Sequence, residues 1–168
     1  PFNGGRQEDL DTVVTPRHRP YVVNDEAITI AAVSGLVSLA RHARDRAAAG
    51  GNAILRATLL PATNALVEIG HNRDHGLVRT RSRVPMPDSV TAESVVPLDA
   101  LADAGPTLAG AAASLVDEIG QAFGIPELGQ LGRDGRLRSR YWSHFWSGQV
   151  ITWAEQHSIE VTSETLTG

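Results

Sequence analysis

The chain contains no cysteine and no lysine. Without thiols it can form no disulfide, no cysteine-ligated zinc site and no thiol nucleophile. All 15 basic residues are arginine, a composition typical of GC-rich genomes such as those of actinobacteria. Arginine is therefore present here by default, and finding it at a position does not indicate a need for its planar fork.

Long apolar runs are also missing. The longest apolar-rich stretch, residues 27–40, is interrupted by Thr29, Ser34 and Ser38, and it is shorter than the about 20 residues that cross a bilayer. We therefore expect no membrane association and, by default, a cytoplasmic protein. With 168 residues and a net charge of −4, the chain suits a single domain, and it is unsuited to coating nucleic acid through bulk charge.

Composition divides the chain into three parts. Residues 1–23 are rich in glycine, proline and charge, which predicts an extended arm or linker whose last residues, 21–23, add an edge strand. Residues 24–162 are expected to form one α+β domain, and residues 163–168 a polar tail. Because the chain opens with Pro1 and not with methionine, we expect it to be a piece of a larger protein.

The first strong pattern predicts a helix over residues 24–49. Asn24 can cap it, and the acidic residues 25 and 26 suit its positive end. Apolar residues recur at helical spacing and leave one narrow polar stripe (Ser34, Ser38, Arg41 and Asp45), which predicts a largely buried helix. Gly50 and Gly51 should end it.

A hairpin is predicted next, with strands at 65–71 and 76–84. A turn centred on Arg73 and Asp74 would pair apolar with apolar residues on one face, and would place Glu68 opposite Arg79 on the other. Segments 53–60, 90–96 and 159–162 are further candidate strands. Short helical turns are expected at 97–104 and 126–131, and full helices at 107–123 and 138–157.

These elements predict an α+β fold. One mostly antiparallel sheet of three to five strands would be packed by the N-terminal helix and the C-terminal helices. The expected core comprises Ile28, Leu36, Leu39, Val67, Ile69, Val78, Leu115, Ile119, Phe145, Trp146 and Trp153.

Alternating arginines form the first candidate site. Arg79, Arg81 and Arg83 would project from one face of a strand, and Arg56 on a neighbouring strand could join them. Like charges about 7 Å apart repel unless an anion lies between them. The pattern favours an ordinary solvated face, with binding of an anionic ligand or an acidic partner as the alternative.

The hairpin tip forms a second candidate. Glu68, His71, Asp74 and His75 carry donor atoms that divalent metals accept, which leaves open a metal-assisted hydrolase. A turn lies between the two histidines, so they do not share a helix face as in known zinc motifs. An ordinary polar hairpin tip, with no bound cofactor, is favoured.

Five of the eight aromatic residues lie within residues 141–153, directly behind the arginines Arg133, Arg136, Arg138 and Arg140. Core packing is the simplest interpretation of the aromatic helix, and a second contact surface that includes Tyr141 and Trp142 is the alternative. Residues 117–131 superficially resemble a helix-turn-helix, which with Arg133, Arg136, Arg138 and Arg140 suggests contacts to nucleic-acid phosphates.

No residues match a known catalytic triad or phosphate-binding loop. We therefore expect a non-catalytic binding or assembly module of a larger, actinobacterial cytosolic protein, whose partner is another protein or a second copy of the chain. A nucleic-acid-associated regulatory domain is the alternative from another class.

Overall fold

The computed structural model of the chain describes residues 21–60, 67–73, 76–79 and 89–163, of which 21, 67, 71–73 and 76–79 are described by their backbone only. In chain order the elements are β1 (Tyr21–Asn24), α1 (Asp25–Ala47), β2 (Asn52–Leu59), β3 (Val67–Arg73), β4 (Gly76–Arg79), β5 (Val90–Pro97), α2 (Leu98–Ala102), α3 (Pro106–Gln121), β6 (Leu137–Arg138), a 3₁₀ turn (Ser139–Tyr141), α4 (His144–Gln156) and β7 (Val161–Thr162).

The fold mixes helices with small sheets, as an α+β protein does. The described strands form three separate sheets in place of the single sheet predicted: β1-β3-β4, β2-β5 and β6-β7. β2 and β5 pair with each other along their whole length, Asn52 opposite Pro97 and Leu59 opposite Val90. β1 lies at the edge of its sheet, as predicted, and runs parallel to β3.

The hairpin register differs from the prediction by two residues. β3 and β4 pair Gly70 with Arg79 and Arg73 with Gly76, so Glu68 is not opposite Arg79. A shift of two residues keeps every side chain on its predicted face, because the side-chain period of a strand is two. The alternation of apolar and polar residues therefore could not distinguish the two registers.

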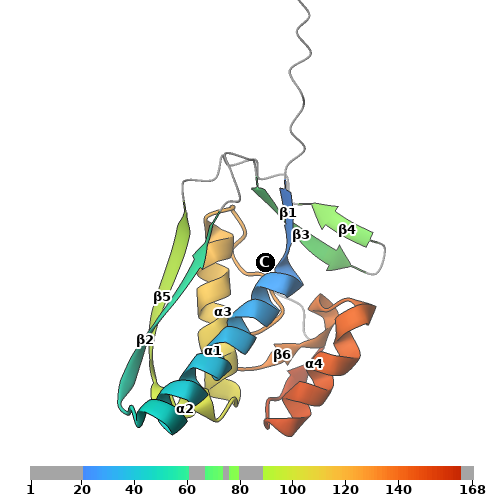
Figure 1. Cartoon of the computed structure of the whole chain (residues 1–168). Helices are drawn as coiled ribbons and strands as arrows, with labels where there is room; N and C mark the ends of the chain where they lie inside the picture. The colour runs from blue at the N-terminus through green and yellow to red at the C-terminus, as the bar shows by residue number, and fades with distance from the viewer. Residues whose placement is uncertain (1–20, 61–66, 74–75, 80–88, 164–168) are drawn as a thin grey trace, which may run out of the picture.

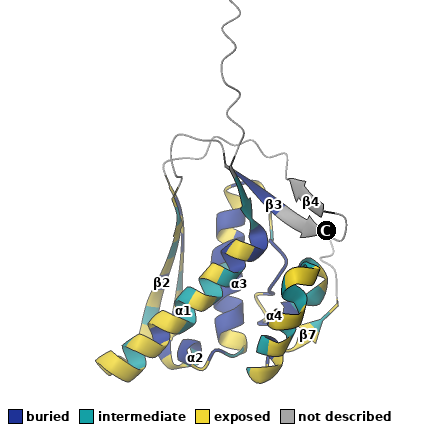
Figure 2. Cartoon of the chain, turned by 45° about the vertical axis from the view of Figure 1, so that its right-hand side comes forward, coloured by how far each residue is buried: buried dark blue, intermediate teal, exposed yellow. Residues whose placement is uncertain are grey.

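Helix α3 is the centre of the molecule. Figure 2 shows it buried along most of its length. Its larger side chains, among them Leu108, Leu115 and Ile119, join a core shared with α1, α2 and the β2-β5 ribbon. Its small side chains Ala109, Ala112 and Ala113 face a second cluster built from α4 and the segment before it. Pro106 at its first position has the backbone angle that a helix start needs.

Helix α1 is less buried than its sequence predicts. Asn24 caps it through a 2.8 Å bond from the Glu26 amide, as expected, but Leu39 is 71% exposed. Figure 1 shows α1 crossing the molecule between the β2-β5 ribbon and α4. Two grooves flank α1: one of about 410 Å³ toward β2 and one of about 420 Å³ toward α4. A narrow polar stripe therefore did not imply burial.

The C-terminal region also corrects the prediction. α4 begins at His144 and not at 138, since residues 137–141 form a short strand and a 3₁₀ turn. Residues 126–131 contain no helix, and therefore the resemblance to a helix-turn-helix fails. Phe145 was expected in the core but is 73% exposed. Ile28, Ile69, Leu115 and Ile119 are buried as predicted, Leu36, Trp146 and Trp153 are partly buried, and the side chains of Val67 and Val78 lie outside the described set.

Candidate functional site: a tryptophan-lined groove between α1 and α4

A buried polar junction holds the start of α1 against the start of α4. Glu26 is fully buried, and its carboxylate accepts bonds from the backbone amide of Ser143 and, at 3.0 Å, from the Ser143 hydroxyl. Asp25 is also buried and accepts a 2.5 Å bond from the Gln130 side-chain amide. Sequence reasoning treated residues 25 and 26 only as charges that suit a helix N-terminus, and it did not find this junction.

The segment between α3 and α4 completes the wall on the α4 side. The Trp142 indole donates to the Gln130 carbonyl oxygen at 3.2 Å, which fixes the ring in the second core cluster. Gly129 has a φ of +95°, and a Cβ there would lie 2.6 Å from Cδ1 of Tyr141. Only glycine therefore lets the Tyr141 ring lie against this backbone.

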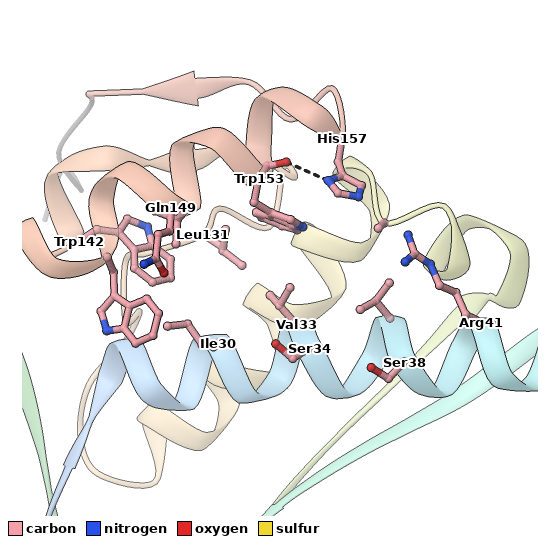
Figure 3. A pocket seen from close by; sticks show the side chains of 14 residues that line it. Ile30, Val33, Ser34, Ser38, Arg41, Leu131, Trp142, Gln149, Trp153 and His157 are labelled. Carbon is pink, nitrogen blue, oxygen red and sulfur yellow. Dashed lines mark hydrogen bonds between the residues drawn. The ribbon is translucent and has the colours of Figure 1, made fainter.

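From this junction a groove runs between α1 and α4, with a volume of about 420 Å³. Figure 3 shows α1 along one side and α4 along the other, with Trp142 near one end and Arg41 near the other. A volume of this size is within the range of small-molecule sites. The lining residues are Ile30, Val33, Ser34, Val37, Ser38, Arg41, Ala104, Leu131, Trp142, Trp146, Gln149, Val150, Trp153 and His157.

All three tryptophans of the chain line this groove. Trp142 is buried, whereas Trp146 and Trp153 are only partly covered, so they present ring surface to the groove. Trp153 also contacts the His157 ring, with 5.7 Å between ring centres. Aromatic rings with a few polar groups nearby are the usual lining of a ligand site.

Apart from Gln149 on α4, the groove's polar groups gather on one rim and at one end. Ser34, Ser38 and Arg41 follow one another along α1, and His157 ends α4 (Figure 3). His157 Nδ1 lies 2.9 Å from the Trp153 carbonyl oxygen. In the described contacts, neither serine hydrogen-bonds to His157.

The Arg41 side chain is exposed, and its Nε donates to the Ala102 carbonyl oxygen at 3.1 Å. The neighbouring Arg44 pairs with both Asp45 at 2.8 Å and Asp103 at 2.9 Å, and these two carboxylates raise the pKa of Arg44. Among the described residues, Arg41 belongs to no ion pair.

The predicted arginine face is divided by the sheet arrangement. Arg56 lies on β2 and pairs with Glu93 of β5 at 2.5 Å, in a different sheet from β4. The Arg79 side chain is not described, and Arg81 and Arg83 lie outside the described residues. The structure therefore separates Arg56 from the hairpin strand, and anion binding by the other three arginines stays a prediction.

Three arginines near the aromatic helix have carboxylate partners. Arg133 pairs with Asp117 at 3.3 Å, Arg136 with Glu160 at 3.0 Å, and Arg138 with Glu127 at 3.2 Å. Arg140 is exposed. Of the predicted contact residues, Trp142 lines the groove, whereas Tyr141 lies against Gly129 outside it.

Asp117 is a buried carboxyl whose surroundings change its pKa. It is 2% exposed and accepts a 3.0 Å bond from the Leu128 amide as well as the pair from Arg133. Burial raises the pKa of this carboxyl above its ordinary value, and the bonds from Leu128 and Arg133 oppose part of that rise.

The predicted metal site at the hairpin tip lies mostly outside the described part of the chain. Glu68 is buried on β3, the side chain of His71 is not described, and Asp74 and His75 are not described at all. Among the side chains that the structure describes, no three histidine, aspartate or glutamate residues converge to hold a metal.

Most groove residues were not identified from the sequence. The polar stripe of Ser34, Ser38 and Arg41 is visible in the sequence, where its narrowness predicts only a largely buried helix. Gln149 interrupts the apolar stripe of the aromatic helix and was the second available signal. Neither signal identifies which helix lies opposite, because α1 and α4 are about a hundred residues apart.

Comparisons with protein-family models, with curated proteins and with solved structures find no match for this chain. In the described part of the chain, every helix is too short or too polar to cross a bilayer.

Proposed function

We propose that this chain is a non-catalytic binding module that takes a small molecule with an apolar body into the groove between α1 and α4. One observation carries the proposal: all three tryptophans line one groove of about 420 Å³. Exposed indole surface is costly in water, and covering it with a ligand recovers that free energy. The cytoplasm is the compartment we propose for it.

The other groove beside α1 is the weaker candidate. It is lined by aliphatic side chains, with Arg56 and Thr58 as the polar groups, and Arg56 is already paired with Glu93. Polar groups that fix orientation distinguish a ligand site from a packing defect. The α1–α4 groove has such groups at one end, and this difference favours it.

Tryptophan fluorescence tests the proposal directly, because every tryptophan lines the groove. We expect 1-octanol, an uncharged apolar probe, to change the emission saturably. Ser34→Phe should abolish the response, since Ser34 lies on the exposed rim and a phenyl ring there fills the groove. Thr152→Phe is the matched control, because Thr152 is exposed on α4 and lies outside the groove lining.

A fluorescence change that is equal in the wild type and in Ser34→Phe would contradict the proposal. So would an emission that octanol leaves unchanged at every concentration. A normal melting temperature for both variants shows that the added ring blocks the groove and does not unfold the domain.

A further inference from the structure

We propose that the natural ligand of this groove is an anionic amphiphile, an apolar body with one carboxylate, and that the carboxylate binds Arg41. The inference rests on the proposed function and adds the chemistry of the ligand's polar end. The observation behind it is that Arg41 of α1 and His157 lie together where α1 passes the end of α4.

Arg41 is positioned as an anion receptor. Its Nε is held by the Ala102 carbonyl oxygen at 3.1 Å, which orients the guanidinium plane. An arginine has five N–H donors, so the two terminal nitrogens keep four of them for a ligand. Two parallel bonds from a guanidinium to a carboxylate are the geometry that such a group favours.

The protein's own carboxylates near Arg41 are committed elsewhere. Asp45 and Asp103 both pair with Arg44, at 2.8 and 2.9 Å. A cation at the end of an apolar groove, with the neighbouring acids occupied, attracts a ligand whose charge is opposite to its own.

His157 supplies a second polar contact at this end. A carbonyl oxygen can only accept, so the 2.9 Å contact with the Trp153 carbonyl requires the proton on Nδ1. Nε2 is then the ring nitrogen left for a ligand: it accepts a hydrogen bond in the neutral ring and donates one to a carboxylate when the ring is protonated. Figure 3 shows His157 and Arg41 at the same end of the groove, above Ser38.

The length of the groove limits the ligand's body. Ile30 and Arg41 both line it and are eleven positions apart on α1, which corresponds to about 16 Å along a helix. A chain of eight to ten carbons or a small ring system fits this span. Its apolar part would lie on Trp146 and Trp153, and its carboxylate would reach Arg41.

The test compares octanoate with 1-octanol, which share a chain and differ in charge, by titrating tryptophan fluorescence of the full chain. We expect the wild type to prefer octanoate. Arg41→Gln should weaken octanoate binding at least about tenfold, as expected for loss of a charge-assisted bond, and should leave octanol binding unchanged. Arg41→Lys keeps the positive charge but loses the planar guanidinium. Its affinity for octanoate should therefore lie between those of the wild type and Arg41→Gln.

Arg46→Gln is the matched control, because Arg46 is exposed in the last turn of the same helix and does not line the groove. If octanol and octanoate bind equally well, and Arg41→Gln changes neither, the anionic ligand is excluded while the apolar binding site stands. If neither probe binds, both proposals fail. If Arg46→Gln weakens octanoate as much as Arg41→Gln does, the effect is general charge, and the assignment to Arg41 is overturned.

Discussion

Ser143 occupies the N-cap position of α4, yet its hydroxyl caps no amide of that helix. The hydroxyl donates to Glu26 at 3.0 Å, and the Ser143 amide donates to the same carboxylate. The residue thus joins the starts of two helices through a contact between residues 117 positions apart in the chain. Its role follows from the buried charge of Glu26 and not from the local helix.

This arrangement predicts an unusual order of stabilities. Ser143→Asp, which an ordinary N-cap tolerates without loss, should be more harmful than Ser143→Ala, because it places a second carboxylate against buried Glu26. We expect it to lower the free energy of unfolding by more than about 2 kcal/mol, and Ser143→Ala by about 1 kcal/mol. Urea denaturation measures both. Ser147→Ala removes a half-buried hydroxyl that donates a long, 3.5 Å bond to the His144 carbonyl oxygen, and it should change little. A stable Ser143→Asp would contradict the junction.

Asp117 predicts a second effect at the residue scale. Because burial raises its pKa in the folded state, the folded chain holds this proton more tightly than the unfolded chain does. Its contribution to stability is complete below the unfolded pKa and is lost as the pH rises through the folded pKa. At neutral pH the buried charge of the Asp117 carboxylate therefore lowers the free energy of unfolding.

We expect Asp117→Asn to remove this pH dependence. The amide keeps an oxygen that can accept from the Leu128 amide, and it carries no charge to desolvate. The free energy of unfolding of the variant, relative to that of the wild type, should therefore rise between acidic and neutral pH. Urea titrations at several pH values measure these free energies of unfolding. A difference between the two proteins that does not change with pH would contradict a raised pKa for Asp117.

At the scale of the elements, replacing glycine by alanine should have opposite effects on stability at two positions. Gly148 lies within α4, where an added Cβ would meet no atom within 4 Å, so Gly148→Ala should stabilise the protein by about 0.5–1 kcal/mol. Gly129→Ala would place Cβ against Tyr141 at a φ of +95°. We expect a loss of about 2 kcal/mol or more, measured by the same denaturation, and equal effects would contradict these backbone assignments.

The helices and strands were largely predictable because their signals are local. The Asn24 cap, the apolar period of α3 and the turn at 133–135 all lie within a few residues of what they determine. The start of α4 was not predictable, since residues 137–138 pair with Val161 and Thr162 in a short parallel sheet. That pairing depends on a strand that lies beyond the helix.

At the scale of the whole molecule, the sequence predicted the fold class but not how the sheets divide. An apolar stripe on a helix has the same sequence pattern whether it faces the core or an open surface. Leu39 and Phe145 were for this reason predicted to be core residues, although both are exposed. The tryptophans were identified as candidate contact residues, but the groove needs α1 as its second wall. The Glu26–Ser143 junction and the packing of Ile30 and Val33 on the cluster around α4, all between residues far apart in sequence, bring the two walls together.

The charge distribution gives the last prediction, which concerns nucleic acid. Three of the four arginines at 133–140 lie within 3.3 Å of carboxylates, and the chain carries a net charge of −4. Binding through phosphate contacts needs unneutralised cations and weakens steeply with salt. We therefore expect the protein to elute from a heparin column at low salt. The ratio of its absorbance at 260 nm to that at 280 nm should be that of protein without nucleic acid.

Removing the carboxylate partners of these arginines should strengthen retention on heparin. Glu127→Gln with Glu160→Gln removes the partners of Arg138 and Arg136 and should delay elution. Asp99→Asn with Glu155→Gln changes the net charge equally at exposed acids that lie outside the ion pairs described, so it serves as the control. Equal delays would show that retention follows net charge alone. A wild type that needs high salt to elute would mean that these ion pairs open on contact with phosphate, and it would restore the nucleic-acid hypothesis.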